Sequence, residues 1–229
     1  MTSRPTGWDA AGDQALCRAG VRRDLVEYAQ NTTLPDAVEL PRVPVFDQAE
    51  SSCVARALVG AAWIRARVQG SVETVFSWRW PWWYGRRDPE VDSGMSFEAA
   101  IAALDERGWC ADSWYPDDGG PPLEAARHAY DQRGLVALRP LAGPYDLRVA
   151  IASGYPVIAG FLSRYGGPHA VVIVGYDSQA WACTVRNSWG DGWGNGGYET
   201  MNLDVIADDS ETLALWAVEW APTASEVAT

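Results

Sequence analysis

Apolar side chains recur at helical spacing in the first half of the chain. Between Cys53 and Val68 they stand three or four positions apart, and Gly70 follows the last of them. This pattern predicts a helix over 53–68 that is capped by Ser51 or Ser52 and ended by Gly70. Four further segments carry capping residues, terminating glycines or the same periodicity and are predicted as helices: 22–30, 97–107, 123–132 and 145–153.

The second half of the chain consists of short apolar runs separated by glycine, asparagine and aspartate. Runs of this length between turn residues are typical of strands. Six strands are predicted, over 136–138, 156–161, 170–176, 182–186, 197–201 and 213–218. Helices followed by strands indicate an α+β protein with two lobes. After the predicted helix over 22–30, three prolines (Pro35, Pro41 and Pro44) predict an extended chain.

Composition excludes several classes of function. The 229 residues suffice for one core or two small lobes that share a cleft. No apolar run reaches 18 residues, so a membrane span is not expected. The first residues lack the apolar segment of a secretory signal, and we expect a cytoplasmic protein. The net charge of −12 disfavours nucleic acid and anionic membranes as partners.

The four cysteines indicate neither a disulfide framework nor a metal site. No two of them have Cys-x-x-Cys spacing, and the chain holds only two histidines, so we expect neither zinc nor any cofactor. Cys17, Cys110 and Cys183 are predicted as free, buried thiols.

Cys53 stands where the first turn of a helix is predicted, and unpaired N–H groups there stabilise a thiolate. Taken alone, a cysteine at such a place is more often a buried structural thiol, and His169, beside an apolar strand, is more often a core histidine. Together with Asn187 and Gln48 they offer a nucleophile, a base, an amide that orients the base and an amide donor. Cys, His and Asn in these roles perform acyl transfer.

Three segments carry a family resemblance: residues 44–53 (PVFDQAESSC), 167–177 (GPHAVVIVGYD) and 186–198 (RNSWGDGWGNGGY). They resemble the Asp-Gln…Ser-Cys, His-Ala-Val…Gly-Tyr and Asn-Ser-Trp-Gly…Gly-Tyr motifs of the papain-like cysteine peptidases, in the same order. Weaker matches extend the resemblance over roughly residues 7–220. The chain is most similar to bacterial members without a long inhibitory propeptide, so no proteolytic maturation is expected.

The resemblance implies a papain-like two-lobed fold, with a helical lobe, a β-barrel-like lobe and the active site in the cleft between them. It places an N-terminal extension that packs across the lobes at 1–45, the helical lobe at about 46–135, the β-rich lobe at about 136–220 and a flexible tail at 221–229. Cys53 would be the nucleophile, His169 the base, and Asn187 the residue that orients His169. Gln48 would complete the oxyanion hole.

The resemblance also implies a role for Trp189, whose side chain would cover the His169–Asn187 hydrogen bond. Trp189 and Gly167 would also contact the substrate. The chain departs from the family pattern before the nucleophile. Gln48 precedes Cys53 by five positions instead of six, Ser51 replaces a glycine, and Glu50 adds a negative charge near the thiolate. These departures bear on the oxyanion hole more than on the nucleophile.

The function predicted is that of a cysteine peptidase that cleaves peptide or amide bonds through a thioester. Two alternatives stay open. The acyl-enzyme could pass to an amine, as in a peptide ligase, cyclase or leader-peptide processor, or the chain could be a non-catalytic peptide-binding module. The aromatic segment 78–84 (WRWPWWY) indicates either core packing or a surface for a hydrophobic partner.

Overall fold

The computed structural model describes residues 33–70, 75–88, 90–115, 119–130, 137–163, 167–207 and 212–220. These residues form helices and one antiparallel sheet, which confirms the predicted α+β class. The predicted helix over 22–30, Cys17 and the tail 221–229 lie outside the described residues. No described helix is long and apolar enough to cross a membrane.

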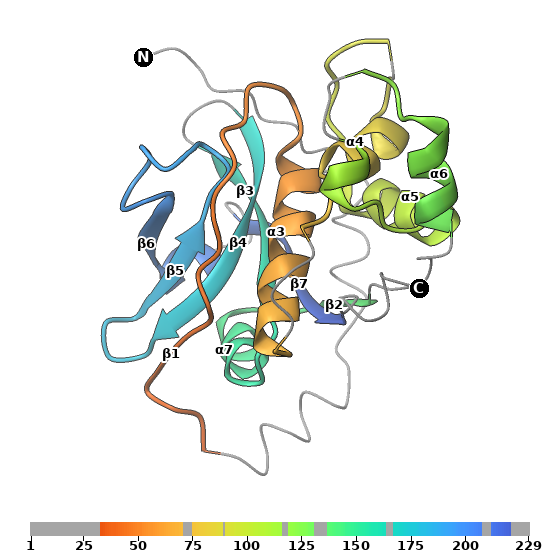
Figure 1. The fold of residues 1–229 in the computed structure, drawn as a ribbon. Coiled ribbons are helices and arrows are strands. Elements are labelled where there is room, and N and C mark those ends of the chain that lie inside the picture. The colour runs from red at the N-terminus through yellow and green to blue at the C-terminus, as the bar shows by residue number, and fades with distance from the viewer. Residues whose placement is uncertain are drawn as a thin grey trace.

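A central helix, α3 (Cys53–Val68), has the bounds that the sequence predicts. Nearly all of its side chains are buried, because it packs on β4 and β7 of the sheet on one side and on α4 and α5 on the other. Figure 1 shows α3 running between the sheet and the smaller helices. Gly60 lies where α3 meets the sheet, and a Cβ there would come within 2.4 Å of Nη1 of Arg186.

The helices beside α3 are α4 (Arg79–Gly85), α5 (Phe97–Arg107), the 3-10 turn η1 (Asp112–Trp114) and α6 (Leu123–Tyr130). The bounds of α5 agree with the prediction. Ser96 Oγ accepts a hydrogen bond from the Ala99 N–H at 3.0 Å, and Gly108 ends the helix with a φ of +81°. The short α4 was not predicted, because prolines and aromatic residues disfavour a helix pattern.

The sheet has the strand order β2-β7-β3-β4-β5-β6, with β1 paired to the far end of β4. Its strands are β1 (Ala37–Glu39), β2 (Ala137–Pro140), β3 (Val157–Ser163), β4 (Gly167–Asp177), β5 (Ala182–Arg186), β6 (Tyr198–Asn202) and β7 (Thr212–Trp220). The six strands that the sequence predicts are all present. Helix α7 (Pro144–Ala152), also predicted, packs on β1, β3, β4 and β7, and α8 (Leu203–Ala207) follows β6.

Strand β1 lies in the segment before residue 45 that the sequence predicts to be extended. It pairs with residues 175–177, beyond the part of β4 that β3 covers. Gly175 permits this approach, since a Cβ there would lie 2.8 Å from the Val38 carbonyl oxygen. Residues 37–39 are thus part of the sheet, while the predicted division into an extension and two lobes stays a prediction.

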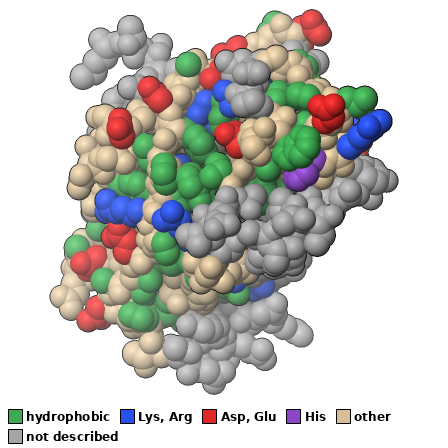
Figure 2. All heavy atoms as spheres, viewed as in Figure 1, with side chains coloured by type: hydrophobic (Ala, Val, Ile, Leu, Met, Phe, Trp, Pro, Cys, Tyr) green, Lys and Arg blue, Asp and Glu red, His purple; other side chains and the backbone are tan. Residues whose placement is uncertain are grey.

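The aromatic segment packs mainly inside the protein. Trp78 and Trp80 are buried, and Trp82, Trp83 and Tyr84 are half-buried. Arg86 lies over Trp82 and Trp83, at 4.5 and 4.4 Å from the ring centroids. These contacts favour core packing over a partner surface at this segment. On the face drawn in Figure 2, charged side chains are scattered among hydrophobic and neutral ones.

Candidate active site

Two segments that lie far apart in the sequence meet as a short antiparallel bridge. Asp47 pairs with Trp189, the Gln48 N–H donates to the Ser188 carbonyl at 2.8 Å, and the Gly190 N–H donates to the Phe46 carbonyl at 2.8 Å. Main-chain hydrogen bonds of this kind fix the register of the two segments. The bridge therefore brings the stretch before Cys53 to the stretch that carries Asn187.

His169 lies on β4 and Asn187 follows β5, and their side chains are joined by a hydrogen bond. His169 Nε2 and Asn187 Oδ1 are 2.8 Å apart, and the Ser188 N–H donates to the same Oδ1 at 2.7 Å. An atom that accepts from a backbone N–H is the amide oxygen, so Nε2 must be the protonated ring nitrogen. A neutral His169 then keeps a lone pair on Nδ1, which is buried and makes no hydrogen bond.

Burial sets the protonation state of His169. The side chain is 0% exposed, and Trp189 stacks on its ring with the centroids 4.6 Å apart and the planes at 26°. Phe161, opposite His169 on β3, contacts the ring edge to face. Removal from water lowers the pKa of His169 to about 4, against the smaller opposing effect of the Asn187 hydrogen bond. Burial thus disfavours the isolated imidazolium.

Cys53 is the first residue of α3, as the sequence predicts, and it is 0% exposed. The expected cap is only partly present. Ser52 occupies the N-cap position, but its side chain makes no capping hydrogen bond. Its hydroxyl instead donates to the Glu50 carboxylate and accepts from Arg56 Nε at 2.8 Å. An ionised partner makes the stronger hydrogen bond, so the hydroxyl is drawn away from the helix N–H groups.

Gln48 is buried and held at both ends of its amide. Ser188 Oγ donates to Oε1 at 2.6 Å, and Nε2 donates to the Glu50 carbonyl at 2.7 Å. A backbone carbonyl can only accept, so the amide atom that faces the Glu50 carbonyl is the nitrogen. The amide oxygen then faces Ser188, whose hydroxyl donates to it. Despite the shortened loop, Gln48 therefore lies in a fixed orientation beside the Asn187–Ser188 segment.

The negative charge expected from Glu50 is compensated. Arg56, three residues after Cys53, donates to Glu50 Oε1 from Nη2 at 2.8 Å and from Nε at 3.1 Å. Neither this ion pair nor the contact of Ser188 with Gln48 was predicted from the sequence. The available signal was a lone arginine in the otherwise apolar first turns of α3, which needs a partner if it is buried.

Gly167, predicted to contact the substrate, is the first residue of β4 and pairs with Ser163. Its φ of +116° lies in a region that favours glycine. Gly167 lies on the same strand as His169, with one residue between them.

The remaining described cysteines are separate from this site. Burial raises the pKa of Cys110 to about 12, with a smaller contribution from Asp112, and burial also raises the pKa of Cys183 to about 12. Both thiols are free. Among the residues that the structure describes, no group of three or more His, Cys, Asp or Glu side chains is placed to hold a metal ion.

The sequence profile described as papain family cysteine protease matches residues 156–211. That stretch holds His169, Asn187 and Trp189 in the arrangement described above. Over this stretch the chain is similar to the papain family of cysteine proteases. Cys53 and Gln48 lie outside the matched stretch, and the fold and the strand bridge connect them to it.

The papain-like fold extends over nearly the whole chain. The crystal structure of xylellain, a cysteine protease from Xylella fastidiosa, superposes with a TM-score of 0.78 at 22% identity, covering 96% of this chain and 97% of that one. The proform of the ragweed pollen cysteine protease Amb a 11 gives 0.68 at 23% identity, covering 94% and 74%. At these identities the likeness shows the papain-like fold alone.

The sequence relatives match shorter stretches of the chain. An uncharacterized peptidase C1-like protein of Acanthamoeba polyphaga mimivirus is 26% identical over 165 residues, which is 57% of this chain and 53% of the viral protein. The matched stretch therefore spans about half of that relative. Macrodontain-1 of Ananas macrodontes is 45% identical over 47 residues, which is 18% of this chain and 22% of that protein.

Proposed function

We propose that this papain-like protein is a cysteine peptidase that hydrolyses peptide or amide bonds through a thioester acyl-enzyme. The observation that carries the proposal is the buried hydrogen bond from His169 Nε2 to Asn187 Oδ1, which leaves Nδ1 as the proton acceptor. A core histidine without a catalytic role would be expected to satisfy both ring nitrogens.

In the proposed reaction, the Cys53 sulfur attacks the substrate carbonyl carbon while His169 Nδ1 takes the thiol proton. The backbone N–H of Cys53 and the Gln48 amide donate to the developing oxyanion. Collapse breaks the C–N bond, and the leaving amine receives the proton from Nδ1. Water then attacks the thioester with His169 as base, which releases the acid and restores the thiol.

Asn187 and Trp189 support the base. Asn187 holds the ring in the tautomer that exposes the lone pair at Nδ1, and the stacked Trp189 ring keeps water from that hydrogen bond. Cys53 and His169 are both closed off from solvent in this structure.

The test combines a thiol-directed peptidyl epoxide with turnover of a peptide pool. The wild-type protein should take up one equivalent of the epoxide at Cys53, and mass spectrometry of the pool should show cleaved peptides. Cys53→Ala should lose both, while the matched control Cys110→Ala should keep both. A wild-type protein that binds peptides without labelling or turnover would overturn the proposal in favour of a binding module.

A further inference from the structure

The five-residue step from Gln48 to Cys53 is organised around one residue, Glu50. Its backbone carbonyl accepts from Gln48 Nε2 at 2.7 Å and from the Ser52 N–H at 2.9 Å. Its carboxylate accepts from Arg56 Nε and Nη2 and from the Ser52 hydroxyl. The atom that holds the Gln48 amide and the charge that binds Arg56 therefore belong to the same residue.

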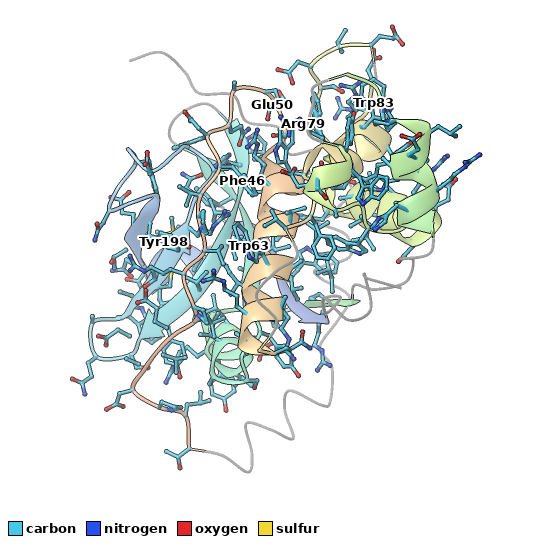
Figure 3. All side chains as sticks on the ribbon, viewed as in Figure 1. Phe46, Glu50, Trp63, Arg79, Trp83 and Tyr198 are labelled. Atoms are coloured by element: carbon cyan, nitrogen blue, oxygen red, sulfur yellow. The ribbon has the colours of Figure 1, made fainter. Side chains whose placement is uncertain are left out.

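Arg56 is a firm anchor for Glu50. It is only 5% exposed, and its guanidinium lies over Trp78 at 3.7 Å and over Phe46 at 5.4 Å from the ring centroids. Figure 3 shows Glu50 and Arg79 at the same end of α3, with Phe46 beside that helix. A planar guanidinium that lies over aromatic rings keeps its donors in one orientation, which a lysine ammonium would not do.

The anchor explains how a shortened loop can still hold Gln48. Ser188 fixes only Oε1 of the amide, so Nε2 could still swing about that contact. The Glu50 carbonyl accepts a second hydrogen bond from the amide, and this bond fixes Nε2. If the Glu50 carboxylate leaves Arg56, the Glu50 backbone is free to turn, and its carbonyl no longer holds Gln48 Nε2.

We propose that the Glu50–Arg56 ion pair positions the Gln48 amide for the oxyanion of the acyl-transfer reaction. The inference rests on the proposed function. Glu50 and Arg56 act as positioning residues, because their contact with the reaction runs through Gln48 and the loop. The pair also compensates the negative charge that Glu50 would otherwise place near a thiolate.

The decisive experiment separates oxyanion stabilisation from thiol reactivity. Alkylation of Cys53 by iodoacetamide passes through no oxyanion, whereas acylation by a peptide substrate does. Glu50→Gln should lower kcat on the peptide about 10- to 100-fold, in the range that a displacement of about 1 Å can cause, with KM changed less than threefold. Its alkylation rate should stay within twofold of wild type. Glu106→Gln, which removes the carboxylate from the exposed Arg107–Glu106 pair, is the matched control and should change neither rate.

A double-mutant cycle tests the route through Gln48. In a Gln48→Ala background, Glu50→Gln should cause little further loss of kcat, because the amide that it positions is gone. Arg56→Lys keeps the charge but not the two hydrogen bonds to Glu50. It should likewise lower kcat and leave the alkylation rate of Cys53 unchanged. Equal losses of kcat and alkylation, additive losses in the double variant, or an unchanged kcat in Glu50→Gln would each overturn the inference. Absence of turnover already in wild type would overturn the proposed function, and this inference with it.

Discussion

The indole of Trp189 lies stacked on the imidazole of His169, with ring centroids 4.6 Å apart and planes at 26°. The two residues come from different segments, β4 and the turn after β5, which the antiparallel ladder of β4 and β5 brings together. The stack covers the ring that donates to Asn187. It also contributes to the burial that lowers the pKa of His169.

Replacing Trp189 by alanine should therefore raise the pKa of His169 from about 4 toward its ordinary 6.5, because water would reach the ring. The exposed hydrogen bond to Asn187 should also weaken, and kcat should fall roughly tenfold, or about 1.4 kcal/mol in the barrier. NMR titration of the His169 ring proton measures the pKa. Trp189→Phe keeps a ring and should show a smaller shift. Equal pKa values in wild type and Trp189→Ala would contradict this account.

Folding stability should fall as the pH drops through the window between 6.5 and about 4. In that window an unfolded chain protonates His169, while the folded protein, with its lowered pKa, keeps the ring neutral. The unfolded state thus binds the extra proton, and the free energy of unfolding decreases as the pH falls, by up to roughly 3 kcal/mol from this group. Urea unfolding at a series of pH values measures the slope.

Two variants isolate this contribution from that of the carboxylates. His169→Gln removes the titrating ring and should flatten the slope between pH 6.5 and 4. His128→Gln removes the other histidine, which lies on α6, and measures whether that ring contributes to the slope. A slope that His169→Gln leaves intact would show that other groups produce it.

Cys53 should be alkylated much faster than Cys110 or Cys183 at neutral pH. Burial alone does not separate the three thiols, since all are buried. The difference lies in their chemistry: the pKa values of Cys110 and Cys183 are raised to about 12, whereas Cys53 begins α3 and has His169 as its proposed base. Peptide mapping after short exposure to iodoacetamide, with urea-unfolded protein as the control, should show an excess of at least about tenfold at Cys53. Equal labelling of Cys53, Cys110 and Cys183 in the folded protein would contradict the assignment of Cys53 as the nucleophile.

The bounds of α3 and α5 could be predicted because apolar spacing, Ser96 and the terminating glycines all indicate the same ends. The strands were predictable because turn residues separate them. Helix α4 and strand β1 were not, since their formation depends on partners distant in sequence: Trp80 is buried against Tyr115, and β1 needs the uncovered end of β4.

For the site, the motif predicted which residues take part but not how the loop before Cys53 is held. Ser51 or Ser52 was expected to cap α3, and the structure shows the Ser52 side chain bound to Glu50 and Arg56. The competition between a helix cap and a buried ion pair depends on whether Arg56 is buried, and that depends on Trp78 and Phe46. Local sequence rules contain no such information.

The contributions of Gln48 and Asn187 should differ in kind. Gln48→Ala removes a donor to the oxyanion and should lower kcat by about 10²–10³-fold, or roughly 2.7–4 kcal/mol, while alkylation of Cys53 stays unchanged. Asn187→Ala frees the His169 ring to rotate or change tautomer, so it should slow both peptide turnover and alkylation, because both require the base. Measuring the two rates side by side in each variant distinguishes the roles. If Gln48→Ala kept its full kcat, another donor would have to complete the oxyanion hole, and the contacts of Gln48 with Ser188 and Glu50 would serve the fold alone.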